Sequence, residues 1–206
     1  GMSAESVDSV AQGRVWTGTA IVLAIAAAGG LYLAWISSWV ILAVGGAAIV
    51  AALGYTGGPW PYGYRGFGEV FVFVFFGLAG VVGSRYVHDA TTTREAWLLA
   101  IPVGFLVTAI LVANNVRDID TDRTAGKHTL AVLLGRRRTR LLYGTLLFGA
   151  FVLIAGFAGF ELTPRWTLLA LGALPLAVAP VRAVATLEAG PELIRALKAR
   201  YPGARF

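Results

Sequence analysis

Apolar residues fill most of this chain in six long stretches, and short polar segments separate each stretch from the next. A bilayer core of about 30 Å is crossed by roughly 20 helical residues, and each stretch has that length or nearly so. The pattern predicts six membrane-spanning helices, at about 17–36, 38–54, 68–88, 97–115, 140–160 and 166–186. The expected fold class is all-α, a polytopic helical bundle that forms a single membrane domain over residues 1–206.

The connecting segments carry turn and capping residues. Ser37 and Ser38 alone separate the first two stretches, which predicts a tight helical hairpin. The segment TTTRE at 91–95 is typical of a loop that ends in an N-cap for the fourth helix. Three prolines fall inside predicted helices, where neighbouring membrane helices tolerate the kinks: Pro102, Pro175 and Pro180.

Composition agrees with a membrane protein and excludes several other classes. Hydrophobic residues make up 57% of the chain and charged residues 14%, with a mean hydropathy of +0.73. The net charge of +6 does not indicate a nucleic-acid-binding domain, because the charges lie between apolar runs instead of on one soluble face. The bilayer, with its anionic headgroups, and phosphorylated substrates are the expected partners. The chain has no cysteine, which excludes disulfides and Cys-based metal sites.

The distribution of basic residues predicts the orientation in the membrane. With the N-terminus inside, fourteen of the 17 Lys and Arg residues fall in inside segments and three fall outside or close to it, namely Arg85, Arg94 and Arg165. Six spans place both termini on the same side of the membrane, which agrees with this asymmetry. Both termini, and the polar segment that follows the fourth helix, are therefore expected on the cytoplasmic side of the cell membrane.

That polar segment, NNVRDIDTDRTAGKHTLAV at 114–132, concentrates charge in an otherwise apolar chain. If the fourth helix continues past Asn115, then Asn114, Asp118 and Asp122 stand at intervals of four residues and share one face within an arc of about 80°. Asp120 points the opposite way. The spacing predicts one polar stripe with two carboxylates a turn apart.

Two neighbouring carboxylates repel each other unless a cation lies between them. Mg²⁺ prefers carboxylate oxygens together with substrate phosphates and waters. Arg117, Arg123 and Lys127 surround the acids, and this acid, metal and base arrangement suits a diphosphate at the membrane surface. The spacing alone leaves the alternative open that this is a solvated, positively charged cytoplasmic loop.

A second unusual segment, YTGGPWPYGYRGFGE at 55–69, is expected on the same side of the membrane. It is rich in Gly, Pro and Tyr, and Arg65 and Glu69 stand at the mouth of the third helix. Aromatic residues and glycines at this depth are also typical of an interfacial belt with turns, so function does not follow from this loop alone. Two such loops on one face together favour a binding site.

The segments NNVRDIDTDRTAGKHTLAVLLG and YTGGPWPYGYRGFGEVFVFVFFGLAGVVGSRYV closely resemble the 1,4-dihydroxy-2-naphthoate polyprenyltransferases, a branch of the UbiA superfamily of intramembrane prenyltransferases. The resemblance extends from the first helix to about residue 199. It implies an all-helical fold with nine membrane helices and two aspartate-rich motifs that bind Mg²⁺ and a polyprenyl diphosphate. It also implies that the naphthoate ring loses its carboxylate as CO₂, giving demethylmenaquinone in menaquinone synthesis.

The resemblance assigns roles to individual residues. Asp118 and Asp122 are similar to the second aspartate motif and would be the catalytic and metal-binding pair. The substrate-binding residues that it implies are Asn114, Asn115, Arg117, Lys127, Tyr55 and Arg65, the last two in the loop that covers the cavity. Phe71, Phe73, Phe75 and Phe76 are interpreted mainly as packing or lipid contacts, with a prenyl groove as the alternative.

The superfamily's other motif, Asn-Asp-x-x-Asp, does not occur in this chain. The chain is therefore expected to lack the N-terminal helices and the last helix of the nine-helix fold. An inactive half-chain, a non-catalytic membrane subunit of the same fold, another aromatic prenyltransferase of the superfamily and a transporter remain alternatives. The transporter is less favoured because the acids lie at a helix end beside a basic loop, not within a span.

Overall fold

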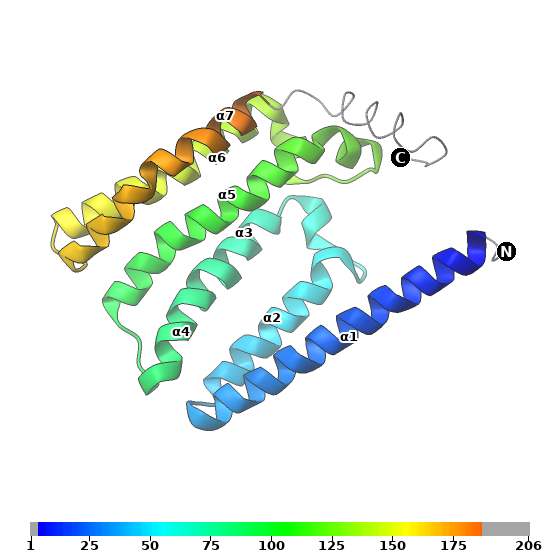
Figure 1. The fold of residues 1–206 in the computed structure, drawn as a ribbon, viewed down its shortest axis with the longest axis horizontal. Helices are drawn as coiled ribbons and strands as arrows, with labels where there is room; N and C mark the ends of the chain where they lie inside the picture. Colours follow the sequence, from blue (N-terminus) through cyan, green and yellow to red (C-terminus); the bar gives the residue numbers. More distant parts are fainter. Residues whose placement is uncertain (1–3, 187–206) are drawn as a thin grey trace.

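The computed structural model describes residues 4–186, and this part of the chain contains only helices and their connections. The helices lie side by side in an elongated bundle (Figure 1). In chain order they are α1 (Ala4–Ile36), α2 (Val40–Thr56), η1 (Tyr62–Arg65), α3 (Gly68–Val72), η2 (Phe73–Ala79), α4 (Gly80–Asp89), α5 (Arg94–Thr124), α6 (Leu130–Gly159), η3 (Arg165–Ala177) and α7 (Val178–Thr186). The predicted all-α bundle is confirmed. The basic segment at 187–206, which was expected to be cytoplasmic, lies outside the described residues.

Five of the six predicted spans are helical segments long and apolar enough to cross a membrane. They are Gly13–Ile36, Gly68–Asp89, Arg94–Thr124, Leu130–Gly159 and Arg165–Thr186. The remaining one, the second predicted span, is the apolar helix Val40–Thr56, whose 17 residues are at the short end of what a bilayer requires. The chain is a multi-pass membrane protein.

Three predicted helix boundaries were wrong by about ten residues: the first helix begins at Ala4 instead of residue 17, and the other two errors lie near the charged segment. The fourth helix does not end near residue 115 but continues to Thr124. The fifth begins at Leu130 instead of residue 140, because the hydroxyl of Thr129 accepts a hydrogen bond from the backbone N–H of Val132 and caps it there. The arginines at 136–138 therefore lie in a helix, just after a kink at Gly135, where φ is 76°.

The third predicted span is helical but not uniformly α-helical, because η2 is a π-helical turn between α3 and α4. At this turn Gly77 packs directly against Gly104 of α5, and a β-carbon at either position would collide with the other element. The sixth span begins as the 3₁₀ helix η3 and becomes α-helical only at Val178, three residues after Pro175, which cannot donate a backbone hydrogen bond.

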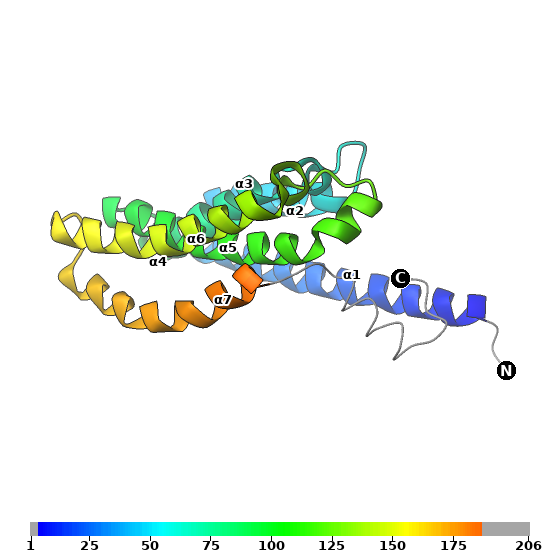
Figure 2. The same cartoon turned by 90° about the horizontal axis from the view of Figure 1, so that it is seen from above.

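α5 is the central element of the bundle, and it packs most extensively against α6. The buried core joins Ala109, Val112 and Val116 of α5 to Tyr143 of α6 and Val184 of α7. Figure 2 shows the η3–α7 segment on one side of the α5–α6 pair, while the α1–α2 hairpin extends away at the other side of the bundle. This packing holds the polar end of α5 next to the loop between α2 and α3.

Candidate functional site

Three polar side chains follow one face of α5 near the charged loop. Because α5 continues to Thr124, Asn114, Asp118 and Asp122 stand one turn apart along the helix, as the spacing predicted. Their exposure falls along this polar stripe: Asn114 is exposed, Asp118 is partly buried and Asp122 is buried. The deepest polar position of the stripe is thus a carboxylate.

The end of α5 places a basic side chain, Lys127, beside the carboxylate of Asp122. Gly126 has a φ of 71°, and the backbone N–H groups of Gly126 and Lys127 donate to the carbonyls of Arg123 and Asp122 at 3.1 and 2.9 Å. This is the Schellman arrangement that ends a helix by reversing the chain. It returns Lys127 to the last turn, where its Nζ lies 3.0 Å from Oδ1 of Asp122. The hydrogen bond to Asp122 raises the pKa of Lys127.

The other acids at this end of α5 are also paired. Arg117 donates from two guanidinium nitrogens to both carboxylate oxygens of Asp118, each at 2.8 Å. Asp120 accepts a hydrogen bond at 2.8 Å from Arg136 of α6, which confirms that it points away from the stripe. Arg136 also donates to the carbonyl of Val116 at 2.9 Å, so it fastens α6 to this end of α5.

The two unusual loops meet, as their shared side of the membrane suggested. The carbonyl of Tyr64 in η1 accepts a hydrogen bond from the backbone N–H of His128 at 2.8 Å. Nζ of Lys127 lies 4.9 Å from the centre of the Tyr64 ring, within cation–π range. Lys127 therefore joins the acidic stripe to the aromatic loop.

Of the two site residues predicted in the loop, Tyr55 lies in the last turn of α2, and Arg65 lies at the end of η1. The ring of Tyr55 packs against Gly63 and Gly68 and meets Tyr62 edge to face at 5.5 Å. The Arg65 guanidinium lies 5.4 Å from the centre of the Trp60 ring. Tyr55 thus packs against the loop from the end of α2, while the exposed Arg65 is stacked on an aromatic side chain of the loop.

Asn115, another predicted site residue, bonds to an acid that the sequence reasoning did not include in the site. Its Nδ2 donates to Oε1 of Glu69 in α3 at 2.8 Å. Glu69 is only 6% exposed. The available signal was a lone acidic residue at the start of an apolar helix, which by itself is also a common feature of helix N-termini.

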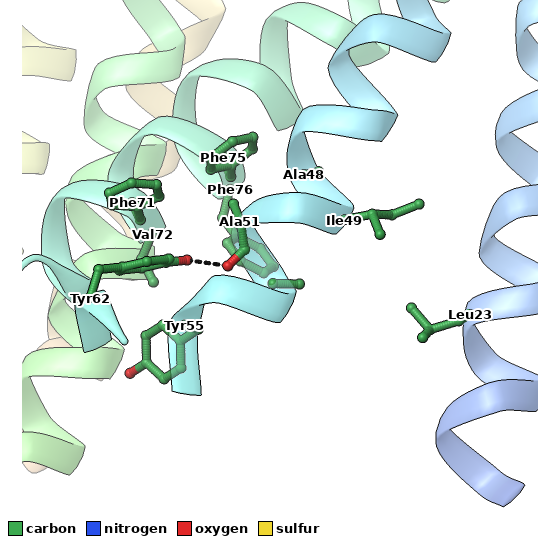
Figure 3. A pocket seen from close by; sticks show the side chains of 11 residues that line it. Leu23, Ala48, Ile49, Ala51, Tyr55, Tyr62, Phe71, Val72, Phe75 and Phe76 are labelled. Atoms are coloured by element: carbon green, nitrogen blue, oxygen red, sulfur yellow. Dashed lines mark hydrogen bonds between the residues drawn. The ribbon is translucent and has the colours of Figure 1, made fainter. Parts of the chain in front are cut away.

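Asp118, Asp122, Arg117 and Lys127 form the charged cluster at the end of α5. An apolar cavity of about 590 Å³ adjoins the aromatic loop, between α1, α2 and the α3–η2 segment (Figure 3). Tyr55 and Tyr62 form its polar end, where the Tyr62 hydroxyl donates to the carbonyl of Ala51 at 2.7 Å. Burial raises the pKa of Tyr62. Phe71, Phe75 and Phe76 line the cavity, whereas Phe73 packs toward Phe105 of α5. Three of the four phenylalanines thus line the cavity, and Phe76 is also 65% exposed.

The donors on α5 suit a hard divalent cation that shares its coordination with a substrate. In the part of the chain that the structure describes, no three His, Cys, Asp or Glu side chains gather into a complete metal site. Mg²⁺ usually takes one or two carboxylates and completes its shell with waters and phosphate oxygens. Asp118 and Asp122 supply that number, and the neighbouring Arg117 and Lys127 attract phosphate.

Comparison with known proteins identifies the relatives of the chain. The sequence model of the UbiA prenyltransferase family matches residues 8–190. A 1,4-dihydroxy-2-naphthoate octaprenyltransferase of Mycobacterium leprae is 41% identical over 184 residues, which cover 89% of this chain and 62% of the relative. Proteins of the same name from Mycobacterium tuberculosis and Escherichia coli are 46% and 45% identical, over 85% and 69% of this chain.

The chain spans about three fifths of the length of the two mycobacterial relatives and 46% of the Escherichia coli protein. No solved structure matches it.

Proposed function

This chain belongs to the UbiA prenyltransferase family, and from that premise we propose that it transfers a polyprenyl group from polyprenyl diphosphate to 1,4-dihydroxy-2-naphthoate. The reaction would release CO₂ and give the quinol form of demethylmenaquinone, a step of menaquinone biosynthesis. The names of relatives 41–46% identical to this chain support the choice of substrates. Proteins of this family generally depend on a divalent metal, and the two carboxylates on α5 favour Mg²⁺.

One observation carries this proposal: the apolar cavity and the charged residues at the end of α5 adjoin the same aromatic segment, where Tyr55 and Tyr62 line the cavity and the Tyr64 ring lies 4.9 Å from Nζ of Lys127. A polyprenyl diphosphate has a charged head and a long hydrocarbon tail, and it requires two such environments side by side. Asp118 and Asp122 would hold Mg²⁺, and Arg117, Lys127 and Asn114 would contact the diphosphate or the carboxylate of the aromatic substrate. The cavity lined by Phe71, Phe75 and Phe76 would receive the first isoprene units.

The chemistry required of these residues is mainly charge stabilisation. The bond between the allylic carbon and the diphosphate oxygen breaks, and its electron pair leaves with the diphosphate. The ring carbon that bears the carboxylate forms the new carbon–carbon bond, and loss of CO₂ restores the aromatic ring. Bound Mg²⁺ would supply Lewis-acid stabilisation of the leaving group. Arg117 and Lys127 add positive charge, and the apolar walls exclude water that would capture the reactive carbon.

Replacement of the metal-binding acids tests the proposal. We expect Asp118→Asn or Asp122→Asn to lower Mg²⁺-dependent prenyl transfer by at least about a hundredfold, because each removes a carboxylate from the shared metal. The measurement is product formation by the reconstituted protein in lipid vesicles. Glu161→Gln, which alters an exposed ion pair with Arg165 instead, is the control and should retain activity.

Near-normal turnover in either aspartate variant would refute the metal assignment. If the unaltered chain binds Mg²⁺ and inorganic diphosphate but forms no product, the chain is instead a non-catalytic part of the same fold.

A further inference from the structure

Glu69 is a carboxylate buried where an apolar span begins, which is costly unless hydrogen bonds compensate for the lost water. Asn115 compensates here, since its Nδ2 donates to Oε1 of Glu69 at 2.8 Å, and Glu69 also lies in the first turn of α3, where a negative charge is favourable. α3 and α5 pack side by side (Figure 1). The hydrogen bond therefore joins α3, which follows the aromatic loop, to α5, which carries the polar stripe.

The contact also fixes which way the Asn115 amide faces. An ionised carboxylate only accepts hydrogen bonds, so the amide must present its NH₂ group to Glu69. The carbonyl oxygen, on the other side of the planar amide, must then point away from Glu69. Asn115 and Asp118 are three residues apart on α5 and are therefore neighbours on its surface. The freed oxygen is thus available on the side of the helix that carries the acids.

We propose that Glu69 is a positioning residue, which acts through Asn115 by holding the amide oxygen of Asn115 toward the bound Mg²⁺–diphosphate. The inference rests on the proposed function, because it assigns an additional oxygen donor to the same site. Glu69 itself does not contact the substrate. Its role is to keep the Asn115 amide from flipping. A flipped amide would present its NH₂ group to the Mg²⁺–diphosphate, which requires an oxygen donor at that position.

Glu69→Gln separates this role from simple packing. Glutamine has the same shape and can still hydrogen bond to Asn115, but it can donate or accept, so it no longer selects one amide orientation. If Glu69 acted only by its charge, its removal would strengthen the binding of an anion. If it positions Asn115, we expect binding of Mg²⁺-loaded inorganic diphosphate to weaken about tenfold, the loss of roughly one charge-assisted contact.

A polarity swap provides the rescue. In Glu69→Gln combined with Asn115→Asp, the glutamine NH₂ donates to one aspartate oxygen and leaves the other oxygen facing the site, with the net charge unchanged. We expect the swap to bind within about threefold of the unaltered chain. Asn115→Asp alone places two carboxylates against each other and should bind at least about tenfold more weakly than the swap. Glu161→Gln is the matched control.

The measurement is calorimetric titration of each purified protein in lipid nanodiscs with Mg²⁺ and inorganic diphosphate, accompanied by thermal unfolding to verify folding. Unchanged or tighter binding by Glu69→Gln, or a swap no better than the single variants, would overturn the inference and leave the proposed function intact. If Glu69→Gln does not fold, the test is the comparison of the double variant with Asn115→Asp. The inference holds only if the double variant binds more tightly. If the unaltered chain does not bind, or if Asp118→Asn binds equally well, the proposed function fails and the inference with it.

Discussion

At the scale of single residues, the site depends on pairs of opposite charge held by local backbone geometry. The buried carboxylate of Asp122 has Lys127 as its partner because Gly126 adopts a left-handed conformation and reverses the chain. Asp118 has Arg117, its neighbour in sequence. Both acids are therefore held close to compensating charge, which lets two carboxylates stand one turn apart in a largely apolar protein.

Lys127→Met should destabilise the protein by about 1 kcal/mol at neutral pH, because Asp122 loses its partner while the apolar stem is kept. The pKa of Lys127 is raised in the folded state by its bond to Asp122. Its contribution is therefore fully present below the unfolded pKa of about 10.4 and is lost as the pH rises through the higher folded-state pKa.

The measurement is the difference in Tm between the unaltered protein and Lys127→Met, which should stay constant from about pH 6 to pH 9 and shrink above about pH 10.5. Arg94→Met, at the other end of α5, is the control for loss of a basic residue. A difference that is zero at neutral pH, or that grows with alkalinity, would contradict the pairing.

At the scale of the elements, the contact between η2 and α5 sets how closely two spans approach. Gly77 and Gly104 meet without side chains, and Phe73 packs over Gly104. A π-helical turn places one extra residue in the helix, which shifts the faces of the residues that follow. Gly77 accordingly meets α5 while Phe75 and Phe76 line the cavity.

Gly77→Ala should lower the stability by roughly 1–3 kcal/mol, because the new methyl group would collide with the Gly104 backbone and force the two spans apart. Gly83→Ala is the matched control, since a β-carbon there meets no atom within 4 Å. Thermal unfolding in detergent compares the two. Equal Tm values for both variants would show that the close approach of η2 and α5 does not exist.

Blocking the cavity tests its role as a site for the prenyl tail. Ala48 lines the cavity and Ala47, the preceding residue on α2, does not. Ala48→Phe should raise the KM for a long polyprenyl diphosphate by about tenfold, while binding of inorganic diphosphate with Mg²⁺ stays unchanged. Ala47→Phe should leave both unaltered. If Ala48→Phe changed the binding of inorganic diphosphate but not the KM for the polyprenyl diphosphate, the tail would have to bind elsewhere.

At the scale of the whole molecule, the end of α5 that carries Asp118 and Asp122 and the loop between α4 and α5 lie at opposite ends of the bundle (Figure 1). The proposed orientation places the cluster in the cytoplasm, since fourteen of the 17 Lys and Arg residues were assigned to that side. A polyprenyl diphosphate would then enter with its head at the cytoplasmic surface and its tail between the spans.

Because the chain has no cysteine, single cysteines can report this orientation. Ala125→Cys, at the end of α5 beside the cluster, should react with a membrane-impermeant maleimide only when the cytoplasmic face is accessible. Thr92→Cys, in the exposed loop between α4 and α5, should react only from the outer face. The opposite pattern would reverse the assignment, and labelling of both from one side would contradict the bundle itself.

The sequence by itself determined the helical class, the approximate spans and the polar stripe, since hydrophobic runs and four-residue spacing depend only on the order of residues. It also predicted an N-cap within the segment at 91–95, and the structure places that cap at Thr93. Helix ends near the charged segment were misplaced because hydropathy falls there before the helices end. α5 continues through its charged residues to the turn at Gly126, and α6 already begins after the Thr129 cap.

Tertiary structure alone decided which distant residues meet. Glu69 and Asn115 are 46 residues apart, and no local pattern signals their hydrogen bond. The contact of Lys127 with Tyr64 and the cavity beside Tyr55 likewise depend on how α2, α3 and α5 pack. Such contacts are set by packing between elements, which the periodicity within any one helix does not encode.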